Sequence, residues 1–242
     1  MNLAHLTLAQ LSIALIPVAV VLVIMWRWGL RVGHALHALA RMLLQLLLIG
    51  YVLIFIFDAD ASPIVLSVLA VMVLASSWIA LNTVEPGQRG ALFKASLLSI
   101  LIGGGLTLAL ITQGVLQLEP WYEPRYMIPL AGMIFANSMT SISLATDRLH
   151  AELSNNNTPD KARLSAYQTA MIPVINSLFA VGLVSLPGMM TGQILSGVSP
   201  FIAARYQIMV MCMIFGSAGI STALFLYWSR HIKPAAAVES VR

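Results

Sequence analysis

Leu186-Pro187-Gly188-Met189-Met190-Thr191-Gly192-Gln193 lies within a 41-residue stretch, Leu164 to Ala204, that contains no charged side chain. A stretch this apolar is typical of a membrane-spanning helix, but proline followed by glycine interrupts helical hydrogen bonding. Inside a bilayer an unpaired backbone amide or carbonyl costs several kcal/mol unless protein or a water-lined cavity satisfies it. Broken membrane helices are used by transporters to present helix ends to a solute. The stretch therefore indicates a transport protein with its substrate path at the break.

The composition places the whole chain in the membrane. Of the 242 residues, 59% are apolar and 9% are charged, and the mean hydropathy is +0.89. Soluble globular domains do not have this composition, so we predict an all-α, polytopic membrane protein. Seven apolar stretches are long enough to cross the hydrocarbon core. They are Leu6–Trp26, Ala38–Phe57, Ile64–Leu81, Leu92–Leu116, Ile128–Ala145, Met171–Leu195 and Ile208–Trp228.

Lysine and arginine are distributed unequally between the two sides of the membrane that these stretches define. Two of them, Arg125 and Arg205, fall on one side and eleven fall on the other. Because cytoplasmic loops retain basic residues near membrane spans, the richer side is predicted to be cytoplasmic, with the amino terminus outside and the carboxyl terminus inside. The eleven are Arg27, Arg31, Arg41, Arg89, Lys94, Arg148, Lys161, Arg163, Arg230, Lys233 and Arg242.

The amino-terminal apolar stretch is interpreted as a retained helix. No lysine or arginine precedes it and no small-residue cleavage pattern follows it, so it lacks the features of a cleaved signal peptide. The chain has one cysteine, Cys212, which argues against an internal disulfide and against a thiolate metal cluster.

Two hydrophilic connectors are predicted to lie on the cytoplasmic side. The longer, Asp147 to Gln168, is expected to form a docking loop followed by a short helix near the membrane, with Thr158 as the N-cap and Pro159 at the first helical position. An ordinary solvated loop is the alternative. In the other connector, Arg31, His34, His37 and Arg41 recur at helical spacing and predict an interfacial helix, or side chains that reach up to the lipid headgroups.

The absence of acidic residues and histidine from the apolar stretches distinguishes between the possible transport and catalytic mechanisms. None of the seven contains Asp, Glu or His, although ion-coupled transporters usually keep such a residue in the membrane as a relay. The same lack argues against a membrane-embedded protease, which needs a buried base or paired aspartates. The chain also has no phosphate-binding loop of the G-x-x-x-x-G-K-[ST] type. Energy is therefore expected from a partner, and ATP, if used, binds another polypeptide.

Small and polar residues recur at helical spacing in the last three apolar stretches and are candidates for a translocation path. Most such residues serve only to let helices approach closely, and this alternative applies to each of them taken singly. Methionines are likewise packing residues more often than ligands. The candidates there are Asn137, Thr140, Ser141, Asn176, Pro187, Gly188, Met189, Met190, Thr191, Gly192 and Gln193, and Gln45 of the second stretch is a further candidate.

Three stretches together resemble one known family. They are Ile128-Pro129-Leu130-Ala131-Gly132-Met133-Ile134, the turn at Thr158-Pro159, and the run from Val181 through Leu195 to Tyr206-Gln207-Ile208; Arg41-Met42 and Gln45-Leu46 extend the pattern to the amino-terminal half. The chain is similar to iron-export ABC permeases of the FetB type, whose plant relatives are linked to aluminium tolerance and to nucleotide-sugar movement. No cofactor is expected in the chain itself.

The resemblance implies a single permease domain over residues 1–242, in a bacterial inner membrane. Two copies would form the pore as a homodimer and pair with two copies of a cytoplasmic ATPase. The ATPase would push on a coupling loop around Thr158, Pro159 and Ala162, and the break at Pro187 and Gly188 would gate the path.

The cargo implied by the resemblance is iron or another metal. With Asn176 rather than a carboxylate in the sixth stretch, metal ligands would come from the outer mouth or from methionine sulfur. A non-metal solute such as a nucleotide-sugar, and a membrane scaffold that senses metal stress without moving solute, remain alternatives. The candidate ligands are Glu119, Glu123, Asp58 and Asp60, or Met189 and Met190.

Overall fold

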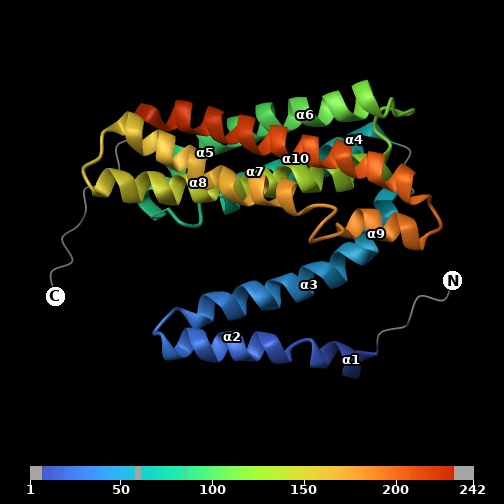
Figure 1. Ribbon diagram of the computed structural model, residues 1–242, viewed down its shortest axis with the longest axis horizontal. Coiled ribbons are helices and arrows are strands. Elements are labelled where there is room, and N and C mark those ends of the chain that lie inside the picture. Colours follow the sequence, from blue (N-terminus) through green and yellow to red (C-terminus); the bar gives the residue numbers. More distant parts are fainter. Residues whose placement is uncertain (1–6, 58–60, 85, 232–242) are drawn as a thin grey trace. The chain divides into compact units, whose positions relative to one another are not determined.

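The computed structural model describes residues 7–57, 61–84 and 86–231, and every regular element in these ranges is a helix (Figure 1). Six helices are long and apolar enough to cross a membrane: Gln10–Arg27, Val32–Leu53, Ser62–Ile79, Gly87–Val115, Pro124–Ser154 and Pro200–Trp228. The prediction of an all-α polytopic membrane protein is therefore confirmed. The chain divides into two compact units, residues 1–58 and 59–242.

The amino-terminal unit consists of three helices, α1 (Leu8–Ile13), α2 (Ile16–Arg27) and α3 (Val32–Phe57). Its first helix begins with a capping box, in which the Thr7 side chain accepts from the Gln10 amide and the Gln10 side chain accepts from the Thr7 amide. None of the α2 side chains is buried, as expected for a helix that is apolar on all sides and faces lipid.

The predicted interfacial helix is not a separate element. Since α3 already begins at Val32, the residues His34, His37 and Arg41 occupy its first turns and are continuous with the apolar segment that follows. No proline or glycine cap separates the basic turns from this segment, which explains why one helix forms. Gln45 lies exposed on the same helix.

The second unit begins with α4 (Ser62–Ile79) and a long helix that changes its hydrogen-bonding pattern along its length. The long helix comprises α5 (Pro86–Ser99), the π-helix η1 (Ile100–Gly104), α6 (Gly105–Ala109) and the π-helix η2 (Leu110–Val115). After it come α7 (Pro124–Ser154), α8 (Pro159–Ala180), α9 (Gly188–Leu195), α10 (Pro200–Trp228) and the 3-10 turn η3 (Ser229–His231).

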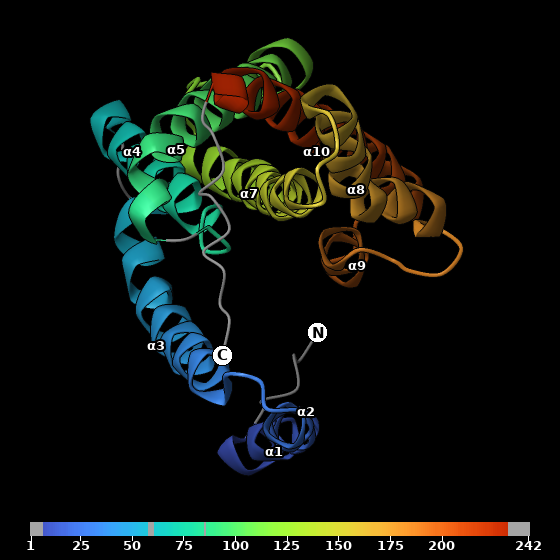
Figure 2. The ribbon, with the colours of Figure 1, turned by 90° about the vertical axis from the view of Figure 1, so that its left-hand side faces the viewer.

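Helix α7 lies between α4 and α8, with α10 packed alongside both α7 and α8 (Figure 2). On α8 the packed face consists of alanines spaced four residues apart, Ala162, Ala166 and Ala170, each with no exposed surface. Side chains this small allow helix backbones to approach closely, which is the main source of helix association in lipid. The α7–α8–α10 frame therefore depends on small residues on one face of α8.

The predicted sixth span, Met171–Leu195, is divided as the Pro-Gly pair indicated. Helix α8 ends at Ala180, and α9 begins at Gly188 after a seven-residue connection. Helix α10 runs back from the end of the unit where α9 lies to the end where α8 begins (Figure 1). The segments α8 and α9 together therefore cover the length that α10 covers alone, as one broken crossing.

The expected cytoplasmic loop Asp147–Gln168 is much shorter than predicted. Helix α7 continues to Ser154, and Pro159 already begins α8, so only residues 155–158 are non-helical. Thr158 and Pro159 do take the predicted N-cap and first helical positions, although the Thr158 side chain makes no capping hydrogen bond. The separate short helix was a wrong prediction, because nothing interrupts α8 until Ala180.

The first prediction concerns the crossing of η1 and α10. A Cβ at Gly103 would lie 2.5 Å from Ser221 Oγ and 2.8 Å from its backbone nitrogen, so Gly103→Ala forces these two backbones apart. We expect a loss of about 1–3 kcal/mol, the usual cost of overpacking, and a lower unfolding temperature in detergent. The matched control is Gly105→Ala, because a Cβ there meets nothing within 4 Å. Equal destabilisation by the two substitutions would contradict this account.

Candidate functional site

The connection between α8 and α9 satisfies the carboxyl-terminal end of α8 with its own backbone. The Ala180 carbonyl accepts hydrogen bonds from the amides of Leu183, Val184 and Ser185, at 3.2, 2.8 and 3.2 Å. Gly182, at φ +82°, provides the left-handed turn that brings these amides back to the helix end. The last carbonyl of α8 is thus paired three times, whereas the Leu178 and Phe179 carbonyls accept no hydrogen bond from the described residues.

The amino-terminal end of α9 has no such cover. Its N-cap is Pro187, which has extended backbone angles and provides no side-chain cap. The amides of Gly188, Met189 and Met190, at the first three helical positions, make no hydrogen bond with any of the described residues. Thr191 does not serve as a cap, since its hydroxyl donates to the Pro187 carbonyl at 3.1 Å. The positive end of the α9 dipole therefore remains open.

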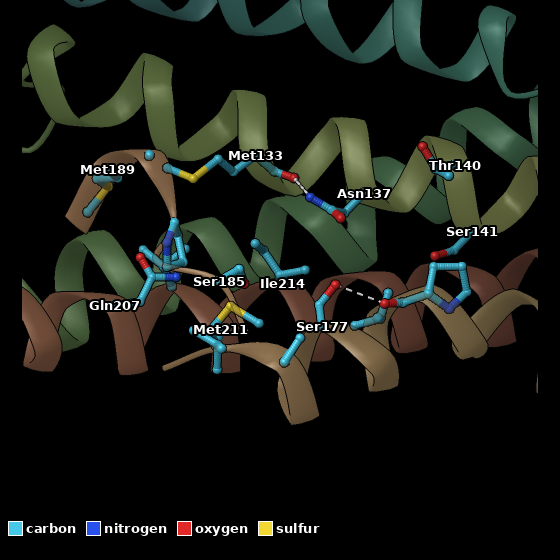
Figure 3. A pocket seen from close by; sticks show the side chains of 17 residues that line it. Met133, Asn137, Thr140, Ser141, Ser177, Ser185, Met189, Gln207, Met211 and Ile214 are labelled. Carbon is cyan, nitrogen blue, oxygen red and sulfur yellow. Dashed lines mark hydrogen bonds between the residues drawn. The ribbon is translucent and has the colours of Figure 1, made fainter. Parts of the chain in front are cut away.

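A cavity of about 390 Å³ lies at this break, bounded by α7, α8, α9 and α10. Both helix ends contribute to its wall, through Ala180 and Val181 on one side and Gly188 and Met189 on the other. A pocket of this size is in the range that accepts a small organic solute. The polar and sulfur-containing side chains of the lining are shown in Figure 3: Met133, Asn137, Thr140, Ser141, Ser177, Ser185, Met189, Gln207 and Met211.

Three of the six hydrogen-bonding side chains in the lining donate within their own helices. The Asn137 Nδ2 group donates to the Met133 carbonyl at 2.8 Å, and the Ser177 hydroxyl donates to the Pro173 carbonyl at 2.9 Å. Thr140 likewise donates to the Ala136 carbonyl at 2.9 Å. None of the described residues that line the cavity is charged. The lining therefore presents amide and hydroxyl groups, thioether sulfur and apolar surface.

Gln207 of α10 differs from the other polar residues of the cavity. Its side chain is 5% exposed, and its Oε1 atom is buried with no hydrogen-bond partner in the described part of the chain. An unpaired buried amide oxygen is costly, so such groups in native proteins usually await a water or a ligand. Gln207 lies on the same side of the cavity as Met189 (Figure 3).

The structure brings half of the predicted path residues together and separates the rest. Asn137, Thr140 and Ser141 from α7 meet Pro187, Gly188 and Met189 at the cavity. The remaining candidates lie elsewhere. Met190 lines a second cavity of about 330 Å³, which Gln207 also lines, and Gln193 lines a third of about 240 Å³ together with Arg125. Thr191 and Gly192 line none of these three cavities. Asn176 is exposed on α8, and Gln45 belongs to the amino-terminal unit.

Five polar or sulfur-containing lining residues were missed by the sequence analysis: Met133, Ser177, Ser185, Gln207 and Met211. For Gln207 a signal existed, because a glutamine inside an apolar helix must find a partner or a polar cavity. Gln207 and Met211 are also four residues apart and share one face of α10. No comparable signal distinguishes Met133 or Ser177 from ordinary packing residues.

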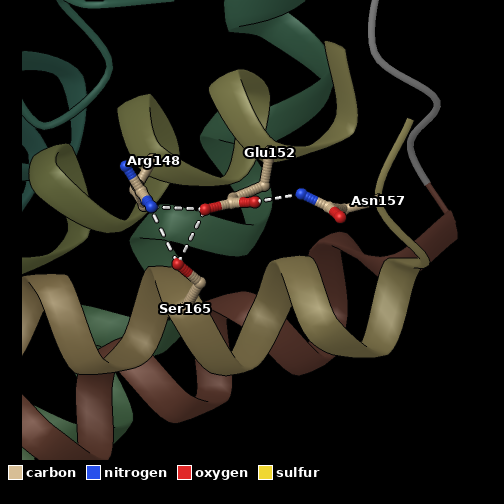
Figure 4. A network of polar contacts seen from close by, with 4 residues as sticks. All are labelled: Arg148, Glu152, Asn157 and Ser165. Atoms are coloured by element: carbon tan, nitrogen blue, oxygen red, sulfur yellow. Dashed lines mark hydrogen bonds and ion pairs between the residues drawn. The ribbon is translucent and has the colours of Figure 1, made fainter. Parts of the chain in front are cut away.

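The second candidate site is the α7–α8 turn, which a polar network holds in place (Figure 4). Glu152 is its centre: it pairs with Arg148 on α7, accepts from Asn157 in the turn, and accepts from the Ser165 hydroxyl on α8 at 2.9 Å. The Arg148 Nε atom also donates to Ser165 at 3.1 Å. The network therefore fixes the end of α7, the turn and the start of α8 relative to one another. Thr158 and Pro159 are exposed beside it, whereas Ala162 is buried.

The sequence matches a known family over nearly its whole length. The match is to the uncharacterised protein family UPF0014, over residues 8–166 and 156–232. The chain belongs to this family. No solved structure matches it.

Three relatives of the UPF0014 chain agree with this assignment. UPF0014 membrane protein slr1647 of Synechocystis is 36% identical over 219 residues, 84% of each chain. The probable iron export permease protein FetB of Escherichia coli is 33% identical over 244 residues, 94% of this chain and 92% of the relative. Protein ALUMINUM SENSITIVE 3 of Arabidopsis thaliana is 35% identical over 213 residues, 81% of this chain and 76% of the relative. The predicted resemblance to FetB-type permeases is confirmed, and this UPF0014 chain is a multi-pass membrane protein.

The metal ligands considered for the outer mouth of the UPF0014 chain do not form a cluster in the described residues. No group of three or more His, Cys, Asp and Glu that could hold a metal ion is found there. Asp58 and Asp60 lie outside the described residues. Of the two methionines considered as sulfur ligands, Met189 lines the main cavity and Met190 the neighbouring one.

The second prediction tests the network at the turn. Glu152→Ala removes the common partner of Arg148, Asn157 and Ser165, so we expect faster hydrogen exchange of the backbone amides in residues 153–162. The control is Asp160→Ala, which removes the exposed ion pair with Arg163 on the same turn and should change exchange little. Equal acceleration by the two variants would show that the network does not hold the turn.

Proposed function

We propose that this UPF0014 chain is the permease subunit of an ABC exporter in a bacterial inner membrane. Two copies form the translocation unit with two copies of a separate ATPase that binds ATP and magnesium. The observation that carries the proposal is the broken α8–α9 crossing, with a cavity at the break, in a chain 33% identical to a protein named as an iron export permease. Iron is accordingly the first cargo to test, followed by other metals.

The need for an ATPase partner rests on the electrostatics of the cavity. A transporter driven by an ion gradient usually titrates an acidic residue or histidine along its path. The described lining residues provide amides, hydroxyls and thioethers, none of which exchanges a proton near neutral pH. Free energy for uphill export is therefore assigned to ATP on a partner chain.

The α7–α8 turn is the proposed contact with that ATPase. The orientation expected from the basic residues places this turn on the cytoplasmic side. Thr158 and Pro159 project at its surface, and Ala162 begins the buried alanine face of α8. Because α8 is continuous from Pro159 to Ala180, a push on the turn displaces the helix end that lines the cavity. The small side chains on the packed face permit that displacement.

The third prediction tests this coupling with Pro159→Ala. Proline at the first helical position fixes the backbone at the start of α8, and its removal should lower ATP-driven export about two- to fivefold, equivalent to the roughly 0.4–1 kcal/mol that restricting the backbone provides. Transport is measured in proteoliposomes that contain the permease with its ATPase. Pro200→Ala is the control, because Pro200 has the same place in α10 at the opposite end of the unit. Equal fluxes in the two variants would remove the coupling role of the turn.

The fourth prediction separates a transporter from a membrane scaffold. A side chain at Gly188 points into open space at the cavity, so Gly188→Leu should abolish most of the flux while the permease still co-purifies with its ATPase. Gly192→Leu is the control, because Gly192 also has open space beside it but does not line the cavity. A chain that never associates with an ATPase, or whose flux ignores ATP depletion, would contradict the proposed function.

A further inference from the structure

The electrostatic polarity of the α8–α9 break favours negative charge. The open amides at the start of α9 carry the positive end of a helix dipole, equivalent to about half an elementary charge. At the opposite end, three amides of the connection donate to the Ala180 carbonyl. The cavity wall at Gly188 and Met189 has unpaired backbone donors, which attract an anionic oxygen.

The smaller cavity next to the main one also favours negative charge. Met133 and Met189 line both the main cavity and the smaller one of about 240 Å³, so the two adjoin at these side chains. The smaller cavity is lined by Arg125, Tyr126 and Tyr206 among others. Arg125 has no ion-pair partner in the described part of the chain. The one charged residue among the described residues that line either of the two cavities is therefore positive.

Gln207 provides an independent indication of a ligand. Its buried Oε1 atom lacks a partner among the described residues, and an amide oxygen accepts a hydrogen bond from a donor such as a hydroxyl. The cavity therefore combines donors for an anionic oxygen at α9 with an acceptor for a hydroxyl at α10. Its volume is many times that which a single water or a bare ion requires.

We propose that the cavity binds a small hydroxycarboxylate, alone or as the chelator of a metal ion. The carboxylate accepts from the open amides of Gly188, Met189 and Met190, and the hydroxyl donates to Gln207. This inference rests on the proposed export function and defines its cargo: the metal leaves as a complex with an organic acid. A bare cation is disfavoured, because it would meet Arg125 and the positive end of α9 without a lining carboxylate.

The experiment measures binding to the purified full-length permease by equilibrium dialysis. The probes are radiolabelled citrate, the same citrate saturated with ferric iron, and ferrous iron alone. We expect citrate or ferric citrate to bind and ferrous iron alone not to bind. Two pairs of variants locate the contacts, and size-exclusion elution and thermal unfolding verify that each variant is folded.

The first pair addresses the α9 amides. Gly188→Pro removes the backbone N–H of residue 188. The substitution is compatible with the fold, because proline is favoured at the first helical position. Pro187, at ψ 147°, already has the backbone conformation that a residue before proline requires. We expect about a tenfold weaker affinity for citrate, as for the loss of one hydrogen bond to a charged group. Gly188→Ala keeps the amide and should weaken binding less than Gly188→Pro.

The second pair of variants tests whether the bound solute is negatively charged. Gln207→Glu should weaken citrate binding by about tenfold or more through like-charge repulsion, and further than Gln207→Leu, which removes only the hydroxyl contact. Gln168→Glu, which adds the same charge at an exposed position on α8, is the control and should leave binding unchanged.

Two results would overturn the inference. One is binding of ferrous iron alone, strengthened by Gln207→Glu; the other is citrate binding that is insensitive to both Gly188→Pro and Gln207→Glu. Either result leaves the proposed function standing if ATP-driven export persists. Failure to associate with an ATPase would contradict the proposed function and would leave the binding constants unaffected.

Discussion

The satisfaction of backbone hydrogen bonds in lipid is the constraint on which this structure depends. A continuous helix meets the constraint within itself, and most of the long helices do so. Between Ala180 and Gly188 the backbone does not satisfy its hydrogen bonds in this way, because the seven residues that connect α8 and α9 are not helical. At one end of the break the connection folds back and pairs with the freed carbonyl, but at the other the amides of α9 remain open to a cavity. Such a departure is tolerated in a membrane where the freed groups are buried in protein or line a water-filled cavity.

The rest of the second unit keeps that break in place. Three fully buried alanines bring α8 against its neighbours, and Gly103 allows η1 to approach Ser221 of α10 so closely that no side chain fits between them. At the far end of α8, Glu152 joins α7, the turn and α8 through one polar network. The proposed push on the turn would therefore act on α8, a continuous helix whose other end lines the cavity.

Local sequence features predicted the ends of the elements well. The Pro-Gly pair placed the start of α9, and Thr158 with Pro159 placed the start of α8. The prediction failed where it equated hydrophilic sequence with loop. Asp147 to Ser154 is polar but helical, because its polar side chains pair with one another across the turn, as Arg148 and Glu152 do. The predicted helix at His34, His37 and Arg41 is present and continues into the apolar segment of α3, since no residue interrupts it.

The sequence by itself determined membrane residence, the approximate limits of most apolar segments, and the position of the break. These properties follow from hydropathy and from the missing amide of proline, both of which act within a few residues. Tertiary structure alone decided which polar side chains share the cavity. Asn137 and Asn176 both stand in apolar segments, yet one lines the cavity and the other is exposed, because the rotation of each helix is set by the neighbours against which it packs. Gln207 likewise became a cavity residue only through the packing of α10 beside the broken crossing.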